Sequence, residues 1–273
     1  MQASPTWTPP TGTLGRIVAE AEHRARALEA RATELSAQAH DAPPAPGFAS
    51  ALRTGTVGVI AEIKRRSPSK GSINPNISAA EQARAYVNGG AAAISVLTEP
   101  DHFGGSPQDL VAVRSAVPVP VLKKDFHVAP IQLVEAKALG ASAALLIARA
   151  LAPEQLRLML DCARDLQIET LVEIRDEAEL ALALAFGAAV IGINNRNLET
   201  LEIDPSRAER LLAKIPGDVV AIAESGVSSR ADVERVALAG ADAVLVGSVI
   251  SAAADPMAAV RSLADVPRVA RGR

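Results

Sequence analysis

Five ionisable side chains stand at the carboxyl ends of apolar runs, where uncharged residues would be expected. The runs are VIAEIK (59–64), VPVLKK (119–124), TLVEI (170–174) and VVAIAE (219–224), and they carry Glu62, Lys64, Lys124, Glu173 and Glu224. A charge at the edge of a buried strand is costly unless it is paired or used. Ammonium and carboxylate groups gathered at one opening would form a set of acids and bases for proton transfer.

The runs that carry these charges alternate with a second set of apolar runs. Gly-Ala occurs at 90–91, 140–141, 187–188 and 240–241, and each pair precedes a run of the second set: AAISVLT, SAALLIA, AVIGIN and DAVLVG. Intervening segments such as 153–166 and 230–240 have helical periodicity. The chain therefore predicts eight strands alternating with helices. Strands this rich in Val, Ile, Leu and Ala are typical of a parallel sheet buried on both faces.

We expect these units to form an α/β fold, a (β/α)8 TIM barrel. An open doubly wound sheet is the competing architecture, but no Gly-rich dinucleotide-binding turn follows the first strand. In a barrel, alternate strands contribute side chains to shared layers, and active sites lie at the carboxyl ends of the strands. The charged ends of the first, third, fifth and seventh strands should therefore converge on one cavity. A rim ion pair is the competing explanation for any single charge.

An N-terminal helical extension should precede the barrel. We expect the extension at 1–47, with a loose Pro- and Thr-rich start, a helix at about 14–36 and a Pro-rich break at 41–47. The helix either packs on the domain surface or lies as a lid near the site. The barrel should span 48–265, and residues 266–273 should form a flexible basic tail.

Composition narrows the class of protein. A net charge of −3 and a pI near 5.9 argue against nucleic acid or an anionic membrane as a partner. We see no signal peptide and no apolar stretch long enough to span a bilayer, so we expect a cytoplasmic enzyme. The single cysteine, Cys162, excludes an internal disulfide and a cysteine-based metal site, and its apolar helical context favours an inert thiol. A monomer is the default, because no exposed apolar helix demands a partner.

Two further features suggest how a ligand would bind. Phe103 and Phe126 fall in loops after the second and third strands, where they either pack locally or wall a slot for a flat apolar group. The last two strands are followed by ESGV (224–227) and GSV (247–249). Loops at these places in a barrel frequently bind phosphate, because glycine lets backbone N–H groups approach an anion and serine adds a hydroxyl.

Six ordered segments resemble the indole-3-glycerol phosphate synthase family over about residues 14–265. They are AEIKRRSPSKG (61–71), LTEPDHFGGSPQDL (97–110), LKKDF (122–126), LVEI (171–174), GINNRNLETLEID (192–204) and AESGV (223–227). The resemblance implies a carbon–carbon lyase of tryptophan biosynthesis that needs no metal and no organic cofactor. Its phosphorylated small-molecule substrate, 1-(2-carboxyphenylamino)-1-deoxyribulose 5-phosphate, would be converted to indole-3-glycerol phosphate, carbon dioxide and water.

The resemblance also implies roles for individual residues. Lys124 matches the general acid, and Glu173 matches a carboxylate that stabilises charge on the anilino nitrogen. Lys64 resembles a lysine that contacts the substrate, Glu62 would orient it, and Asp125 would only hold Lys124 in place. Other implied substrate contacts are Ser67, Phe103, Phe126, Leu145, Asn194, Arg196, Glu224 and Ser225. The phosphate-binding positions are Lys64, Ser67, Gly226, Gly247 and Ser248.

Two other functions stay open at this point. Phosphoribosylanthranilate isomerase is a barrel of the same pathway, but a cysteine and an aspartate are the typical acid and base of that family. Here the first strand carries Glu62 and Lys64, and Cys162 lies in a helical segment. The other alternative is a catalytically silent barrel that binds a phosphorylated ligand, which the intact acid and base positions disfavour.

Overall fold

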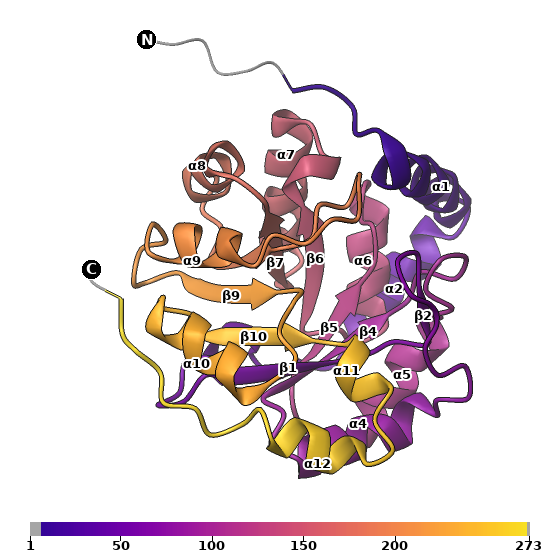
Figure 1. Ribbon diagram of the computed structural model, residues 1–273. Coiled ribbons are helices and arrows are strands. Elements are labelled where there is room, and N and C mark those ends of the chain that lie inside the picture. The colour runs from indigo at the N-terminus through magenta and orange to yellow at the C-terminus, as the bar shows by residue number, and fades with distance from the viewer. Residues whose placement is uncertain (1–6, 272–273) are drawn as a thin grey trace, which may run out of the picture.

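The structure, a computed structural model, describes residues 7–271 and contains a closed barrel of eight parallel strands (Figure 1). The strands pair in chain order, and the last one closes the barrel against the first, with Ile60 opposite Leu245. They are β1 (Gly58–Ile63), β4 (Ala93–Leu97), β5 (Val121–Lys124), β6 (Ala143–Ile147), β7 (Glu169–Ile174), β8 (Val190–Asn194), β9 (Val220–Glu224) and β10 (Ala243–Val246). The predicted (β/α)8 barrel is therefore confirmed.

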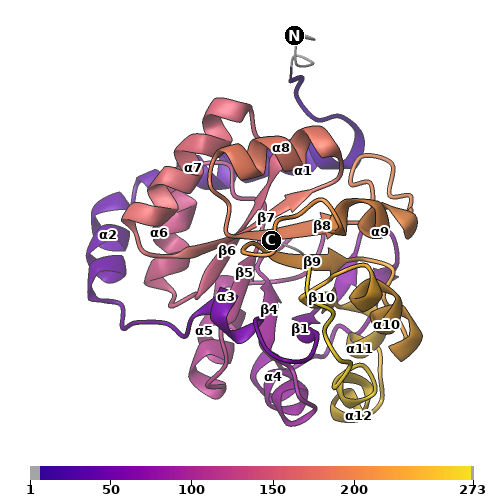
Figure 2. The same cartoon turned by 90° about the vertical axis from the view of Figure 1, so that its left-hand side faces the viewer.

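Helices connect the strands and surround the barrel (Figure 2). They are α4 (Ala79–Asn88), α5 (Pro107–Ala116), α6 (Pro130–Ala138), α7 (Pro153–Asp165), α8 (Glu177–Ala185), α9 (Ser206–Leu212), α10 (Arg230–Leu238), α11 (Ser248–Ser251) and α12 (Pro256–Arg261). A short hairpin of β2 (Arg66–Ser67) and β3 (Gly71–Ser72) follows β1, and a 3₁₀ turn, η1 (Ala148–Ala150), follows β6. Within the described residues, no helix combines the length and apolar character needed to cross a membrane.

The Gly-Ala repeat marks the ends of alternate helices. Gly90, Gly140, Gly187 and Gly240 follow α4, α6, α8 and α10 with φ between 79° and 100°, a left-handed conformation that favours glycine. The N–H of the alanine after each glycine donates to a carbonyl five residues earlier, as in Ala141 to Ala136 at 3.0 Å. This arrangement is the Schellman motif, which ends a helix and turns the chain. Each Gly-Ala pair thus leads the chain from a helix into the strand that follows it, β4, β6, β8 or β10.

Strand residues alternate between the barrel interior and the helices outside. Lys123 and Lys124 at the end of β5 show the difference. Lys123 is buried against α6, where its Nζ lies 2.7 Å from an oxygen of Glu135. Lys124 points the other way and lies near the ends of β7 and β9. The period of two along a strand therefore decides which lysine reaches the interior.

The N-terminal extension differs from the prediction. The single helix expected at about 14–36 is wrong, because two helices occupy this segment: α1 (Gly12–Glu29) and α2 (Ala32–Asp41). The residues at the break favour helix, but tertiary packing overrides this propensity. α1 buries Leu14 and Ile17, α2 buries Leu35 and Ala39, and both helices contact α6. A further short helix, α3 (Phe48–Ala51), leads into β1.

The C-terminal segment also differs from the expected flexible tail. The Val57 N–H donates to the Val266 carbonyl at 2.8 Å, next to a bridge that pairs Thr56 with Pro267. Arg268 and Arg271 each lie 2.7 Å from a different oxygen of Asp242, a buried carboxylate before β10. A buried carboxylate needs such cations, so residues 266–271 are fixed. Residues 272–273, like 1–6 of the predicted loose start, lie outside the described residues.

Candidate active site

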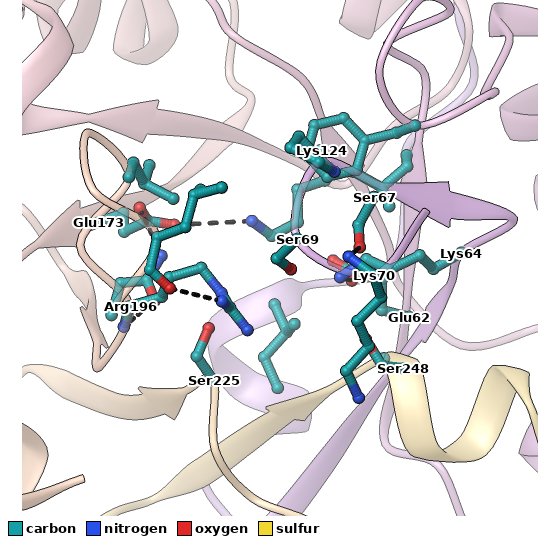
Figure 3. A pocket seen from close by; sticks show the side chains of 18 of the residues that line it. Glu62, Lys64, Ser67, Ser69, Lys70, Lys124, Glu173, Arg196, Ser225 and Ser248 are labelled. Atoms are coloured by element: carbon teal, nitrogen blue, oxygen red, sulfur yellow. Dashed lines mark hydrogen bonds and ion pairs between the residues drawn. The ribbon is translucent and has the colours of Figure 1, made fainter. Parts of the chain in front are cut away.

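A cavity of about 270 Å³ opens at the carboxyl ends of the barrel strands (Figure 3). The cavity brings together almost all of the residues that the sequence predicts for the site. Those that line it are Glu62, Lys64, Ser67, Phe103, Lys124, Phe126, Leu145, Glu173, Asn194, Arg196, Ser225, Gly226, Gly247 and Ser248. Glu224 is not among the lining residues. It is buried beside Lys124, with Oε2 3.8 Å from Nζ.

Lys124 is the central cation of the cavity. Its Nζ lies 3.6 Å from Glu173 Oε2 and 3.8 Å from Glu224 Oε2. Burial by itself would lower the pKa of Lys124, but the charges of Glu173, Glu224 and Glu62 outweigh this effect and raise the pKa above its ordinary value. Lys124 is therefore an ammonium ion at neutral pH, with a proton ready to be shared with a bound molecule.

Glu224 is a buried carboxyl group that holds its proton more tightly than an exposed one. Burial raises its pKa to about 8, and the neighbouring Glu173 adds to this increase, whereas Lys124 opposes it. Oε1 of Glu224 has no hydrogen-bond partner among the described residues. It lies so close to Gly192 of β8 that a Cβ atom at position 192 would collide with it. Glycine in the GIN segment thus makes room for this carboxyl group.

Glu173, Asn194 and Arg196 form a hydrogen-bonded series at one side of the cavity. The Asn194 side-chain amide donates to Glu173 Oε1 at 2.9 Å, and Asn194 Oδ1 accepts the Arg196 backbone N–H at 2.9 Å. The Arg196 guanidinium donates to the Leu201 carbonyl at 2.8 Å. Within residues 7–271 it forms no ion pair, so it remains available to an anion.

Glu62 and Lys64, two residues apart in the chain, form an ion pair, which agrees with the expectation that Glu62 orients Lys64. The Lys64 Nζ lies 2.5 Å from Glu62 Oε1, and Glu62 is only 1% exposed. The same Nζ lies 6.0 Å from the centre of the Phe103 ring. Lys64 therefore stands between a buried carboxylate and the aromatic side of the cavity.

Phe103 and Phe126 form an aromatic wall. Their ring centres are 6.2 Å apart, and the rings are tilted by 36°. The backbone N–H of Phe103 donates to Glu99 at 3.0 Å, and that of Phe126 donates to Asp125 at 2.8 Å. Each ring is thus held by a buried carboxylate at the base of its loop.

One arginine of α1 joins these two carboxylates. Arg24 lies 3.5 Å from Glu99 and 3.4 Å from Asp125. Asp125 also accepts the hydroxyl of Thr98 at 2.6 Å. The hydrogen bonds of Asp125 therefore fix the Phe126 loop, and none of them goes to Lys124, contrary to the expected role. α1 reaches the site as well, because Thr13, Leu14 and Ile17 line the cavity.

The segments after β1, β9 and β10 form a further part of the cavity wall. Ser67 lies in the first segment, Ser225 and Gly226 in the second, and Gly247 and Ser248 in the third. Ser225 and Gly226 both have positive φ, 62° and 82°, and this conformation is rare for serine. Such strained backbone is concentrated at functional sites.

Sequence reasoning missed several lining residues. Lys70 in the loop after β1 adds a further cation, and the loop after β8 adds apolar side chains: Leu198, Leu201 and Ile203. The SPSK and NLETLEI segments that carry them were visible in the sequence, but nothing in their composition shows which way the loops fold. Cys162 lies half-buried on α7 and does not line the cavity.

Comparisons with known proteins found matches in one family. The profile of the family described as indole-3-glycerol phosphate synthase matches residues 14–263. Indole-3-glycerol phosphate synthase 2 of Streptomyces coelicolor is 48% identical over 258 residues, which cover 93% of this chain and 99% of the relative. Indole-3-glycerol phosphate synthase of Mycobacterium ulcerans is 50% identical over 231 residues, 85% of each chain.

A solved structure shows the fold alone. Thiamine phosphate pyrophosphorylase from Pyrococcus furiosus matches with a TM-score of 0.59 and 14% identity, over 77% of this chain and 94% of that one. The family profile and the relatives cover nearly the whole chain, including the extension and the barrel. The chain therefore belongs to the indole-3-glycerol phosphate synthase family.

Proposed function

We propose that this protein is an indole-3-glycerol phosphate synthase, a carboxy-lyase of tryptophan biosynthesis. The observation that carries the proposal is the ammonium group of Lys124, held between Glu173 and Glu224. It lies at the bottom of a cavity that has an aromatic wall and serine- and glycine-rich loops. The substrate, 1-(2-carboxyphenylamino)-1-deoxyribulose 5-phosphate, combines an aromatic ring, a ketone and a phosphate.

The substrate would lie across the cavity. Its phosphate would bind near Gly226 and Ser248, and its aromatic ring would pack against Phe103 and Phe126, with Leu145 beside them. The substrate carboxylate would be held by Arg196, which lies across the cavity from Ser248 (Figure 3). Arginine can grip a carboxylate with two parallel hydrogen bonds. This placement puts the ketone near Lys124.

Ring closure joins the carboxylate-bearing ring carbon to the ketone carbon. As this bond forms, the ketone oxygen gains negative charge, and Lys124 would neutralise it by giving it a proton. Loss of carbon dioxide then restores the aromatic ring. The new hydroxyl group leaves as water, with a proton supplied by the acids of the cavity and another removed from the ring system. Glu173, Lys64 and Glu62 would transfer these protons, and the buried Glu224 would act through its contact with Lys124 rather than through the predicted contact with a substrate hydroxyl.

Fluorescence of the indole product tests the proposal directly. Purified protein mixed with the substrate in the presence of a chelator should produce a fluorescence increase, because no metal is required for the chemistry described. Lys124→Met serves as the matched control and should remain silent. A folded wild-type protein that forms no indole-3-glycerol phosphate, but isomerises phosphoribosylanthranilate, would overturn the proposal. We place the reaction in the cytoplasm and expect a monomer, which sedimentation would check.

A further inference from the structure

The end of β1 extends beyond its neighbour β10. The backbone N–H and carbonyl groups of the even-numbered β1 residues point toward β10. The Gly58 N–H, for example, donates to the Asp242 carbonyl at 2.9 Å. The last paired residues are Ala61 and Val246, where β10 ends. If β10 were longer, the Glu62 carbonyl and the Lys64 N–H would both bond to the backbone of one further β10 residue, as in any parallel pair of strands. No strand residue is present there to receive them.

The side chain of Ser251 takes the place of that residue. Its hydroxyl donates to the Glu62 carbonyl at 3.0 Å and accepts the Lys64 N–H at 3.1 Å. Ser251 is fully buried, so water does not compete for these groups. A serine hydroxyl can donate once and accept twice, which lets it replace both backbone groups of a strand residue.

A second buried hydroxyl completes the arrangement. The hydroxyl of Tyr86 in α4 lies 3.2 Å from Ser251 Oγ and accepts the side-chain amide of Gln82 at 2.9 Å. Burial raises the pKa of Tyr86 to about 12, so the phenol keeps its proton. The Tyr86 hydroxyl also lies 3.4 Å from the Glu62 carbonyl, so both its proton and that of Ser251 have an acceptor in this cluster. The Glu62 carbonyl is thus contacted by both hydroxyls, and that of Ser251 is the nearer one.

We propose that Ser251 is a positioning residue that fixes the Glu62–Lys64 pair relative to α11. Both residues of the pair are held through their backbone groups by one hydroxyl. The same short helix, α11, begins at Ser248, which lines the cavity. Ser251 therefore sets the spacing between the lysine and the loop where the phosphate would bind. This inference rests on the proposed function for its kinetic part only.

The physical consequence of removing the hydroxyl is specific. Ser251→Ala leaves the Lys64 N–H buried without an acceptor, and a buried unpaired N–H is costly. The Glu62 carbonyl keeps only the longer contact of 3.4 Å with the Tyr86 hydroxyl. The end of β1 should then shift toward a new partner. Misplacement of a catalytic group by about 1 Å can lower turnover by about 100-fold. We expect kcat to fall between about tenfold and 100-fold and KM to change less than about threefold.

Hydrogen exchange tests the arrangement without relying on activity. In protein labelled with ¹⁵N-lysine, the Lys64 amide should exchange at least about tenfold faster in Ser251→Ala than in wild type, because its acceptor is lost. The strand amides of Lys123 and Lys124 should be unchanged and serve as internal controls. Equal protection of Lys64 in both proteins would overturn the inference, even if the wild-type protein had no synthase activity.

Kinetics test the positioning role. Ser251→Thr keeps a hydroxyl and should recover most of the lost kcat, and Tyr86→Phe, which leaves both Ser251 backbone contacts in place, should lose less than Ser251→Ala. Ser262→Ala, which removes an exposed helix hydroxyl, is the matched control and should behave as wild type. If Ser251→Ala frees the Lys64 amide but keeps kcat within about twofold, the hydroxyl has only a structural role. A wild-type protein without turnover would instead refute the proposed function.

Discussion

Replacing Lys124 by methionine should remove the acid and also leave buried charge without its counter-ion. Methionine matches the length of the lysine stem, so the change is mainly electrostatic. Lys124 lies within 3.6 and 3.8 Å of two carboxyl groups that are 3% and 2% exposed. Because its charge lowers the pKa of Glu224, its loss should raise that pKa further. The effect on stability should therefore depend on pH.

The magnitudes follow from burial. Loss of general acid catalysis costs about 10²–10⁴ in rate, and we expect kcat of Lys124→Met to fall by at least about 10³. Removing one partner of a buried ion pair costs about 3–5 kcal/mol while the other remains charged. At about 2–4 °C per kcal/mol, the melting temperature at pH 8.5 should fall by on the order of 10 °C. At pH 5.5 the fall should be smaller, because the Glu224 carboxyl, whose pKa is raised, takes up a proton.

Thermal melts at both pH values, together with the fluorescence assay, measure these effects. Lys214→Met is the matched control, because Lys214 forms a shorter ion pair, 2.8 Å, with Glu177, but both side chains are more than half exposed. An exposed pair contributes about 0–1 kcal/mol, so this variant should melt like wild type and keep its turnover. Equal destabilisation by the two substitutions, or a loss for Lys124→Met that is the same at pH 5.5 and 8.5, would refute the reasoning.

Three further predictions concern the surroundings of Lys124. Glu224→Gln should become progressively more stable than wild type as the pH rises from about 4.5 to about 8. In urea melts, the difference between the two free energies of unfolding should grow by up to about 1.4 kcal/mol per pH unit. In that range the native carboxyl of the wild type binds more protons than the unfolded one. Gly192→Ala should lower stability by about 1–3 kcal/mol in the same assay, since its Cβ meets the Glu224 carboxyl. Arg24→Gln should raise KM about tenfold in steady-state kinetics by loosening the two phenylalanine loops, whereas Arg26→Gln on the same helix should not.

The convergence of the charged residues could be predicted from the sequence because two simple rules determine it. Strand residues alternate between two faces, and parallel strands all end at the same edge of the barrel. Glu62, Lys124 and Glu173 meet these conditions and lie around one cavity. Their positions depend on backbone periodicity alone, so no knowledge of loop structure is needed.

Features that depend on tertiary packing could not be predicted in this way. The segment from Glu29 to Ala32 reads as continuous helix, yet the chain turns there because α1 and α2 each pack on α6. The arginines near the C-terminus read as a loose basic tail, yet Asp242 binds two of them. Asp242 is more than 20 residues away in sequence, and no local pattern links it to them.

Ser251 illustrates a deeper limit of sequence reasoning. It stands in an alanine-rich segment after β10, where a serine is ordinarily a helix residue of little consequence. Its importance arises from a difference in length between β1 and β10, which leaves two backbone groups without a strand partner. Strand ends are the least certain part of a sequence-based prediction, so a residue that completes a strand end is not recognisable before the structure is known.

Protonation of Glu224 makes the net charge around the cavity more positive. Sequence reasoning assigns three carboxyl groups, Glu62, Glu173 and Glu224, and two lysines to the ends of the strands. When Glu224 holds a proton, the three carboxylates that line the cavity, Glu62, Asp125 and Glu173, face four cationic side chains: Lys64, Lys70, Lys124 and Arg196. The cavity is therefore positive before any ligand binds, which suits a substrate with a carboxylate and a phosphate. Burial of one carboxyl group beneath the surface thus contributes to anion recognition, although that group does not line the cavity.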